Sequence, residues 1–323
     1  MKPQQPHPSI TRIALLLAWA ILGSASASAQ MNDANLAPAF ANDLPTRFTC
    51  EKLRLIPIVG NASYEKAYQD IGEYVPMNKA LQDGRLKIKE QEGGATVNTL
   101  QAVNTSKDTI YLMQGEVVVG GKQDRMLAQD VIVPPGATIN IGAFCVEHGR
   151  WQAGSTGHEF KGTIGVVGQQ ARKAAAVEKE QTRVWEEVAK DIKKNETESR
   201  SGSYAHLMED QEFQAERKRY REKLLSLPSS SAGIVGVIAV SGDKVVGCDV
   251  FATRELFAQA YPQLIDAYIA EALNNGKAVT MTDAQVRDYF TGLFNDERQL
   301  EERSKGKGYL FKSSGRKYRL SMF

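Results

Sequence analysis

The feature of this chain that most constrains its fold is a series of short apolar segments between residues 51 and 168, separated by glycine and proline. Gly93-Gly94, Gly120-Gly121 and Pro134-Pro135-Gly136 provide the breaks. Short strands that follow one another in this way, without intervening helices, are typical of antiparallel sandwiches and barrels. We therefore expect a β-rich domain over residues 50–168 with an antiparallel, β-sandwich-like core. The strands predicted there are Leu53–Val59, Leu86–Glu90, Val97–Val103, Thr109–Met113, Glu116–Val119, Asp130–Val133 and Thr138–Phe144.

The pattern changes at Gln169, where a helical segment begins. Residues 170–194 contain no glycine or proline, and their apolar side chains recur at helical spacing, which predicts one long amphipathic helix. A charged helix is expected over Gln211–Leu227, so residues 169–231 are interpreted as a helical insert and linker. The apolar stripe of the long helix is Ala171, Ala174, Val177, Val184, Val188 and Ile192.

Residues 232–323 are predicted to form an α+β part that packs on the β core. A strand pair is expected over Gly233–Phe251. It is followed by a short helix at 254–260 and a second helix that opens at Pro262. Thr282 and Gln285 have the spacing of a capping box, which predicts the start of a third helix. The chain is expected to end in a β-hairpin, so the fold class is α+β with a long helix and a helical C-terminal part.

Residues 1–29 have the parts of a secretory signal peptide. A basic start precedes the apolar run Ile13–Leu22, and Ala27-Ser28-Ala29 is a small-residue cleavage site. The run is shorter than the roughly 20 residues of a membrane-spanning helix, so no stable membrane anchor is expected after cleavage. Residues 30–49 lack periodicity and are expected to be a flexible lead. We therefore expect export to the periplasm or the extracellular space.

The mature chain carries no charge excess. Cleavage removes Lys2 and Arg12 and no acidic residue, so the 40 basic and 38 acidic residues become 38 and 38. Nucleic-acid binding usually requires a basic excess, and no nucleic-acid partner is expected. No metal-binding spacing or cofactor motif is found, so neither is predicted. An odd number of cysteines leaves at least one thiol free, and a disulfide between two of them stays open. The cysteines are Cys50, Cys145 and Cys248.

Two glycine-containing stretches combine several charged side chains. They are Gly115–Arg125, with the letters GEVVVGGKQDR, and Cys145–Trp151, with the letters CVEHGRW. If the two stretches are neighbours, their charges converge at one end of the sheet. We assign possible acid or base roles to Glu147 and Glu116. The predicted ligand-binding residues are Lys122, Gln123, Arg125, Arg150 and Trp151.

Three interpretations of this cluster are open. Arginine binds phosphate and carboxylate by paired hydrogen bonds, so the first is a site for an anionic small molecule or glycan. The second is a hydrolase in which the two glutamates act as acid and base. The third is a purely structural set of ion pairs, in a structural or interaction protein of the cell envelope.

The two stretches also resemble a known family. GEVVVGGKQDR, followed by PPG and CVEHGRW, is similar to the ARG and rhodanese-phosphatase-superfamily-associated protein domain, a bacterial domain of unknown function. The resemblance extends over roughly residues 50–323 and includes GVIAVSGDKVVGCDVF and the terminal hairpin. It implies no particular reaction, and its name suggests nucleotide or ADP-ribose metabolism only by association. The motif positions in this chain are Gly115, Glu116, Gly120, Lys122, Gln123, Arg125, Cys145, Glu147, Gly149, Arg150 and Trp151.

Overall fold

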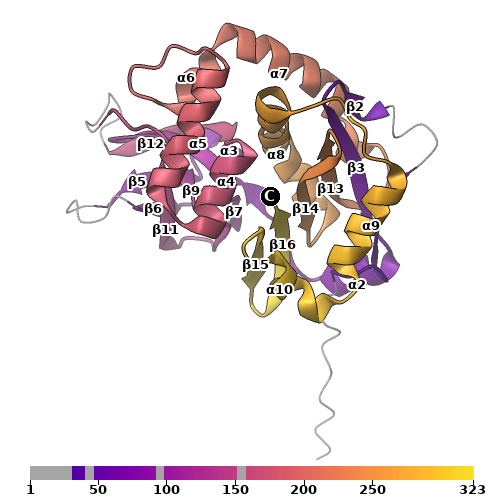
Figure 1. The fold of residues 1–323 in the computed structure, drawn as a ribbon. Helices are drawn as coiled ribbons and strands as arrows, with labels where there is room; N and C mark the ends of the chain where they lie inside the picture. Colours follow the sequence, from indigo (N-terminus) through magenta and orange to yellow (C-terminus); the bar gives the residue numbers. More distant parts are fainter. Residues whose placement is uncertain (1–30, 41–46, 92–97, 151–157) are drawn as a thin grey trace, which may run out of the picture.

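The structure is a computed structural model that describes residues 31–40, 47–91, 98–150 and 158–323 of the 323-residue chain (Figure 1). The predicted signal peptide and Trp151 lie outside the described residues. The described residues form two main β units, a closed barrel and a seven-stranded sheet, and a small third sheet. Both are antiparallel and helices cover them, so the predicted α+β class is confirmed.

The first unit is a closed barrel of six strands in the order β11-β6-β5-β12-β8-β9. We expected a sandwich, and the difference comes from two strands that the sequence did not suggest. β9 pairs with β8 and β11, and β12 pairs with β5 and β8, so every edge finds a partner and the sheet closes. The strands are β5 (Leu86–Glu90), β6 (Thr99–Asn104), β8 (Glu116–Gly120), β9 (Arg125–Leu127), β11 (Thr138–Cys145) and β12 (Glu159–Val166).

A small sheet and a short helix lie against the barrel. The sheet has the order β10-β7-β4, and its β4–β7 pair is parallel. Its apolar side chains join those of the barrel strands in one buried cluster. The elements are β4 (Val75–Pro76), α3 (Met77–Gln82), β7 (Ile110–Leu112) and β10 (Val131–Val133).

The second unit is a sheet in the order β1-β3-β13-β14-β16-β15, with β2 paired to β3. It combines strands from the first part of the described chain with strands from its last part, and the two parts meet where β3 pairs with β13. The expected terminal hairpin is confirmed, and Ser314 and Gly315 turn it with φ of 49° and 76°. The strands are β1 (Leu36–Pro38), β2 (Thr49–Cys50), β3 (Leu53–Gly60), β13 (Ile234–Ser241), β14 (Lys244–Phe251), β15 (Gly308–Ser313) and β16 (Arg316–Met322).

The helix α8 (Arg254–Asn275) contacts β13 and β14 of the sheet and β12 of the barrel. We expected two helices here, but the helix continues through Pro262. Burial of apolar side chains on both sides of the proline favours one continuous helix, and the carbonyl of Pro262 accepts a hydrogen bond from Arg221 at 2.8 Å. The capping box that opens α9 (Asp283–Phe294) is confirmed. The remaining helices of this half are α2 (Ala62–Tyr68), η3 (Glu297–Gln299) and α10 (Leu300–Ser304).

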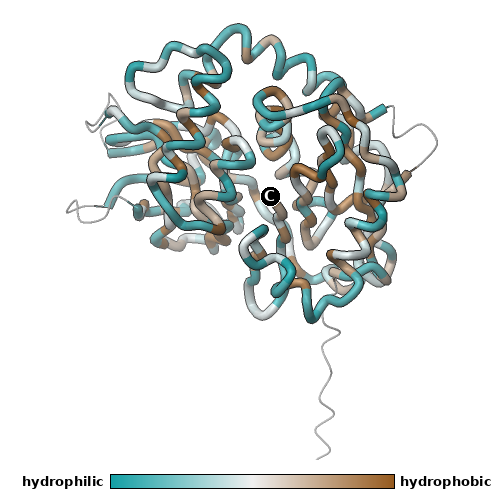
Figure 2. Tube along the Cα trace, viewed as in Figure 1, coloured by the Kyte–Doolittle hydropathy of each residue, from teal (hydrophilic) through white to brown (hydrophobic). Residues whose placement is uncertain are grey.

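The helices between the two units cover the barrel and run across to the sheet (Figure 1). The predicted long helix is divided, because Lys179 adopts a left-handed φ of 57° after a π-helical turn. The apolar stripe of its second part is buried, as expected. Figure 2 shows hydrophilic residues along the outer helices and apolar residues toward the interior. The helices are α4 (Gln169–Lys173), η1 (Ala174–Glu178), α5 (Gln181–Lys194), α6 (Tyr204–Glu209), α7 (Gln211–Leu224) and η2 (Leu227–Ser229).

Two further observations concern the whole described chain. Among the described residues, none of the helices combines the length and apolar character that a bilayer-spanning segment requires. The three cysteines are free thiols, with Cys145 and Cys248 buried and Cys50 half-buried.

Candidate functional site

The first sequence motif forms the turn between β8 and β9 at one end of the barrel. Gly120 and Gly121 have φ of 124° and 55°, a conformation that side chains disfavour. A Cβ atom on Gly121 would also lie 2.8 Å from the ring of Phe160. The turn therefore needs glycine, and it directs Lys122 and the following polar residues to the barrel rim.

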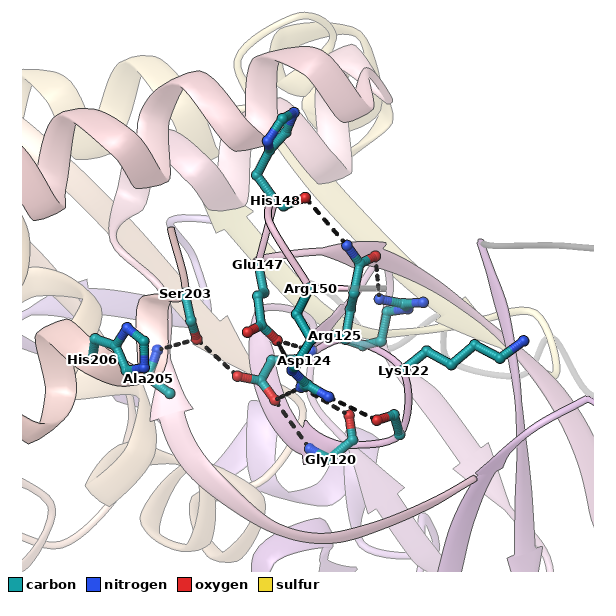
Figure 3. A network of polar contacts seen from close by, with 12 residues as sticks. Gly120, Lys122, Asp124, Arg125, Glu147, His148, Arg150, Ser203, Ala205 and His206 are labelled. Atoms are coloured by element: carbon teal, nitrogen blue, oxygen red, sulfur yellow. Dashed lines mark hydrogen bonds and ion pairs between the residues drawn. The ribbon is translucent and has the colours of Figure 1, made fainter. Parts of the chain in front are cut away.

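The second motif runs beside this turn. β11 ends at Cys145, and the amide of Val146 then donates to the carbonyl of Asp124 at 3.1 Å. The carboxylate of Glu147 accepts from the amide of Asp124 at 3.1 Å and from Nε of Arg150 at 2.9 Å. The structure therefore brings the two motifs together at one rim (Figure 3).

Arg150 is at the centre of this arrangement. One terminal nitrogen of its guanidinium lies 2.6 Å from Glu147 and 3.2 Å from Asp124, and the other donates to the carbonyl of Gly121 at 2.8 Å. Burial lowers the pKa of Arg150, but the hydrogen bond and charge of Glu147 and the charge of Asp124 raise it overall. The side chain nevertheless remains 27% exposed.

The other members of the cluster are more deeply buried. Asp124, Arg125 and Glu147 are 6%, 2% and 3% exposed. Burial raises the pKa of Asp124, against the hydrogen bonds from Gly120 and Ser203, and it lowers the pKa of Arg125. The cluster contains three cations and three carboxylates, so its formal charge is balanced, and Lys122 contacts Glu90 through its backbone amide. We call it the rim network, and its members are Glu90, Lys122, Gln123, Asp124, Arg125, Glu147, Arg150 and Ser203.

A third segment, missed by the sequence analysis, completes the rim network. Ser203 caps α6 and donates to Asp124 at 2.8 Å. The amide of Gly149 donates to the carbonyl of Ser201 at 2.7 Å, and a Cβ atom on Gly149 would lie 3.0 Å from Ser201 Cα. This contact gives a physical reason for the glycine of CVEHGRW. A serine at the start of a weak helical pattern was the only local signal.

Histidines surround the rim network. His206 lies 2.7 Å from the hydroxyl of Ser199, and His158 lies 3.2 Å from Glu90. His148 packs edge-on against Trp185, with ring centroids 4.5 Å apart. No group of three or more metal-binding side chains occurs within the described ranges. The histidines therefore serve separate contacts in this structure.

The comparison with known families identifies the chain. Residues 43–321 match the ARG and Rhodanese-Phosphatase-superfamily-associated Protein domain. The chain belongs to this family. The resemblance expected from the two motifs is thus confirmed over nearly the whole mature chain. No curated protein matches it significantly. No solved structure does so either.

In this family member, Glu116 lies apart from the rim. Glu116 begins β8 and Gly120 ends it, so about 13 Å of strand separates the two ends. The carboxyl of Glu116 accepts from the amide of Met113 at 2.9 Å and is 2% exposed. Burial raises its pKa to about 8. The expected acid–base pair of Glu116 and Glu147 is therefore not brought together. Glu147 lies near the Gly120 end of β8, at the rim, whereas Glu116 lies at the opposite end of the same strand.

A second buried cluster, which the sequence analysis did not predict, joins the barrel to the sheet. Arg319 donates to Asp249 at 2.7 and 3.1 Å and to Asp130 at 2.8 Å, and Arg172 donates to Asp249 at 3.3 Å. Tyr268 and Ser321 also donate to Asp249. Burial opposes the charge of Asp249, yet the two arginines lower its pKa well below its usual range. We call Asp130, Arg172, Asp249, Tyr268, Arg319 and Ser321 the junction network.

Proposed function

We propose that this family member is an exported protein that binds a small anionic ligand, bearing phosphate or carboxylate, at the solvent-facing side of the rim network. Arg150 carries the proposal. Its guanidinium is fixed by carboxylates and backbone carbonyls, and yet more than a quarter of the side chain is exposed. A fixed guanidinium loses little conformational freedom when it binds an oxyanion. The ligand is a small molecule or a glycan, and no nucleic-acid partner is proposed.

The proposal distinguishes residues that contact the ligand from residues that position them. Lys122, which is half-buried, and Arg150 are proposed to contact the ligand. Gln123, Arg125 and Glu147 are buried and are proposed to position these cations. From the sequence we had expected Gln123 and Arg125 to contact the ligand directly. Trp151 follows Arg150 directly and stays a predicted ligand residue outside the described ranges.

Charge balance makes binding depend on pH. An incoming anion adds negative charge next to Asp124, whose pKa is already raised by burial. Proton uptake by Asp124 would offset that charge. We therefore expect anion affinity to increase from neutral to mildly acidic pH and to decrease with added salt.

The test is calorimetric titration of the mature protein with inorganic phosphate and with citrate. Arg150→Gln is expected to abolish binding, and Lys122→Gln to weaken it. Arg219→Gln is the matched control, because Arg219 is an exposed arginine on α7, away from the rim, that pairs with Glu51. Equal affinity in wild type and Arg150→Gln would reject the proposal. A lower melting temperature in Arg150→Gln, with no anion binding in any variant, would favour the structural interpretation and a role as an envelope interaction protein.

A hydrolase is the second proposal, and the raised pKa of Glu116 favours it. A carboxyl group with a pKa of about 8 keeps its proton at neutral pH and can act as a general acid. Glu147 would then act separately, at the rim. Turnover of chromogenic phosphate and acyl esters should be lost in Glu116→Gln and not in Arg219→Gln. Absence of turnover in the wild-type protein with both ester classes would count against this activity.

Export is tested independently of ligand binding. Residues 1–29 are proposed to be cleaved after Ala29 on the basis of the tripartite sequence pattern. N-terminal sequencing of protein recovered from the periplasm or the medium should begin at Gln30. Recovery of the uncleaved chain in the cytoplasm would reject this part of the proposal.

A further inference from the structure

Both ends of the helix α5 are attached to other elements by side-chain hydrogen bonds. At its first residue, Gln181 accepts from the amide of Cys145 at 2.8 Å and donates to the carbonyl of Cys145 at 2.9 Å. Near its last turn, the carboxyl of Asp191 accepts from Asn274 of α8 at 2.7 Å. α5 therefore connects the second motif of the rim with the helix α8.

Three acidic side chains lie close together where α5 packs on α8. Glu187 and Asp191 are one turn apart on α5, and Glu271 lies on α8. Glu187 has cationic partners, because Arg183 and Lys190 lie 3.1 and 2.7 Å from its carboxylate. Neither of the other two carboxyl groups forms an ion pair with a residue that the structure describes. Two acidic groups are thus left without a paired cation between the helices.

Amide side chains bind these two carboxyl groups. Gln170 and Asn275 donate to Glu271 at 3.3 and 3.2 Å, as an asparagine of α8 does to Asp191. Lys194, on the last turn of α5, donates to Asn275. A hydrogen bond from an amide stabilises a carboxylate less than a charge-assisted bond from a cation does. The contact between α5 and α8 therefore has an excess of negative charge when both groups ionise.

The carboxyl of Asp191 has little space for a hydration shell. A Cβ atom on Gly168, at the start of α4, would lie 2.8 Å from its second oxygen. Tyr204 of α6 is also near, since burial and then the charge of Asp191 raise the pKa of that tyrosine. Residues of α4, α6 and α8 thus surround the group, and a poorly hydrated carboxyl resists ionisation.

These surroundings make Asp191 a weak acid. Burial raises its pKa to about 7, although the hydrogen bond from Asn274 lowers it. The charges of Glu271 and Glu187 raise this pKa as well, and the charge of Lys194 lowers it. The ordinary value is 3.8, so the packed helix holds the proton more strongly than a helix whose carboxyl is in water. The contact between α5 and α8 is therefore strongest at acidic pH and weakens as the pH rises toward 7.

We propose that Asp191 is a proton switch that holds α5 against α8 in its protonated form and releases this end of α5 when it ionises. The buried apolar stripe of α5 opposes the release, so the released form is a minor state. Through the contact of Trp185 with His148, movement of α5 reaches the second motif. The inference does not depend on the anion site proposed at the rim.

The test is hydrogen–deuterium exchange of the mature protein, measured on peptides of α5 and corrected at each pH for the intrinsic exchange rate. The released fraction should rise with pH above the ordinary pKa of 3.8 and level off above about 7. We expect an increase of at least about tenfold from pH 5 to pH 8. Asp191→Asn cannot ionise but keeps an oxygen that accepts from Asn274, and it should show no such increase.

Two further variants make the test specific. Asn274→Ala removes the hydrogen bond that favours the ionised form, so the exchange of α5 should level off at a higher pH than in the wild type. Asp288→Asn is the matched control, because Asp288 is an exposed acid on α9, and it should behave as the wild type does. The same pH dependence in wild type and Asp191→Asn would overturn the inference. A difference between these two proteins that is equally large in α9 would also overturn it, because the whole protein would then be unfolding.

Discussion

The rim network and the junction network both contain equal numbers of basic and acidic side chains. They differ in the sequence separation of the paired residues and in how deeply the side chains are buried. Ion pairs between described residues of the rim network join side chains 3 to 35 positions apart, as from Arg150 to Glu147 and from Arg125 to Glu90. Ion pairs of the junction network join side chains 70 to 189 positions apart, as from Arg319 to Asp249 and Asp130. The side chain of Arg150 is 27% exposed, whereas that of Arg319 is fully buried. Solvent access therefore supports the ligand site that we propose at the rim, while the junction network connects the two β units.

The largest effect is expected at the junction. Arg319→Met leaves Asp249 and Asp130 without their shared cation in a buried setting, which should cost about 3–5 kcal/mol of unfolding free energy. Urea denaturation measures the loss. Arg298→Met is the control, because the Arg298 side chain is 91% exposed, and its cost should stay within about 0.5 kcal/mol. Similar costs in the two variants would show that the junction network contributes nothing to stability.

The next effect concerns Glu116, between the two networks, and depends on pH. Its pKa is about 8 in the folded protein against 4.5 for a free glutamate, so the folded state binds the proton more strongly. Stability should therefore fall as the pH rises from about 4.5 to about 8 and change no further, through this group, above that. Each pKa unit is worth about 1.4 kcal/mol, so the difference between 4.5 and about 8 gives a loss of at most roughly 5 kcal/mol.

Glu116→Gln removes this ionisation and should abolish that part of the pH dependence. The variant should match the wild type at acidic pH and exceed its stability at alkaline pH, since the amide can still accept from the amide of Met113. Denaturation at a series of pH values checks this. Parallel pH profiles for the two proteins would mean that Glu116 is ionised in the fold.

A smaller effect tests how the rim network is attached to the helical segment. Gly149→Ala places a Cβ atom 3.0 Å from Ser201 Cα, and the backbone must shift, at a cost of about 1–3 kcal/mol. Gly162→Ala is the matched control, because a Cβ atom on Gly162 meets nothing within 4 Å. Thermal unfolding should separate the two variants. If they melt together, the contact with Ser201 is not tight.

The smallest effect on stability is expected from Arg150→Lys. The ammonium keeps one contact to Glu147 but loses the fork that reaches Asp124 and the carbonyl of Gly121, and the site is partly exposed. We expect a cost below about 1 kcal/mol, together with a clear loss of anion affinity. If Arg150→Lys lowered the free energy of unfolding as much as Arg319→Met, the two networks would not differ in their contribution to stability.

The local elements of the fold followed from the sequence by itself. Short apolar segments between glycine and proline breaks predicted most barrel strands, the spacing of Thr282 and Gln285 predicted the start of α9, and the turn residues Ser314 and Gly315 suited the terminal hairpin. These features depend on neighbours within a few residues. For the same reason the meeting of the two motifs was predictable, because a hairpin turn and the next strands along the chain lie close together.

Only the tertiary structure decided how the barrel closes and which charged side chains are buried away from solvent. Barrel closure requires β8 and β12 to pair over a long sequence separation, and no local pattern specifies that register. The separation of Glu116 from Glu147 and the burial of Arg319 depend on which surfaces exclude water after packing. A side chain's type determines which interactions it can form. Its partners and its solvation are determined by distant segments, and these set the energy of a charge.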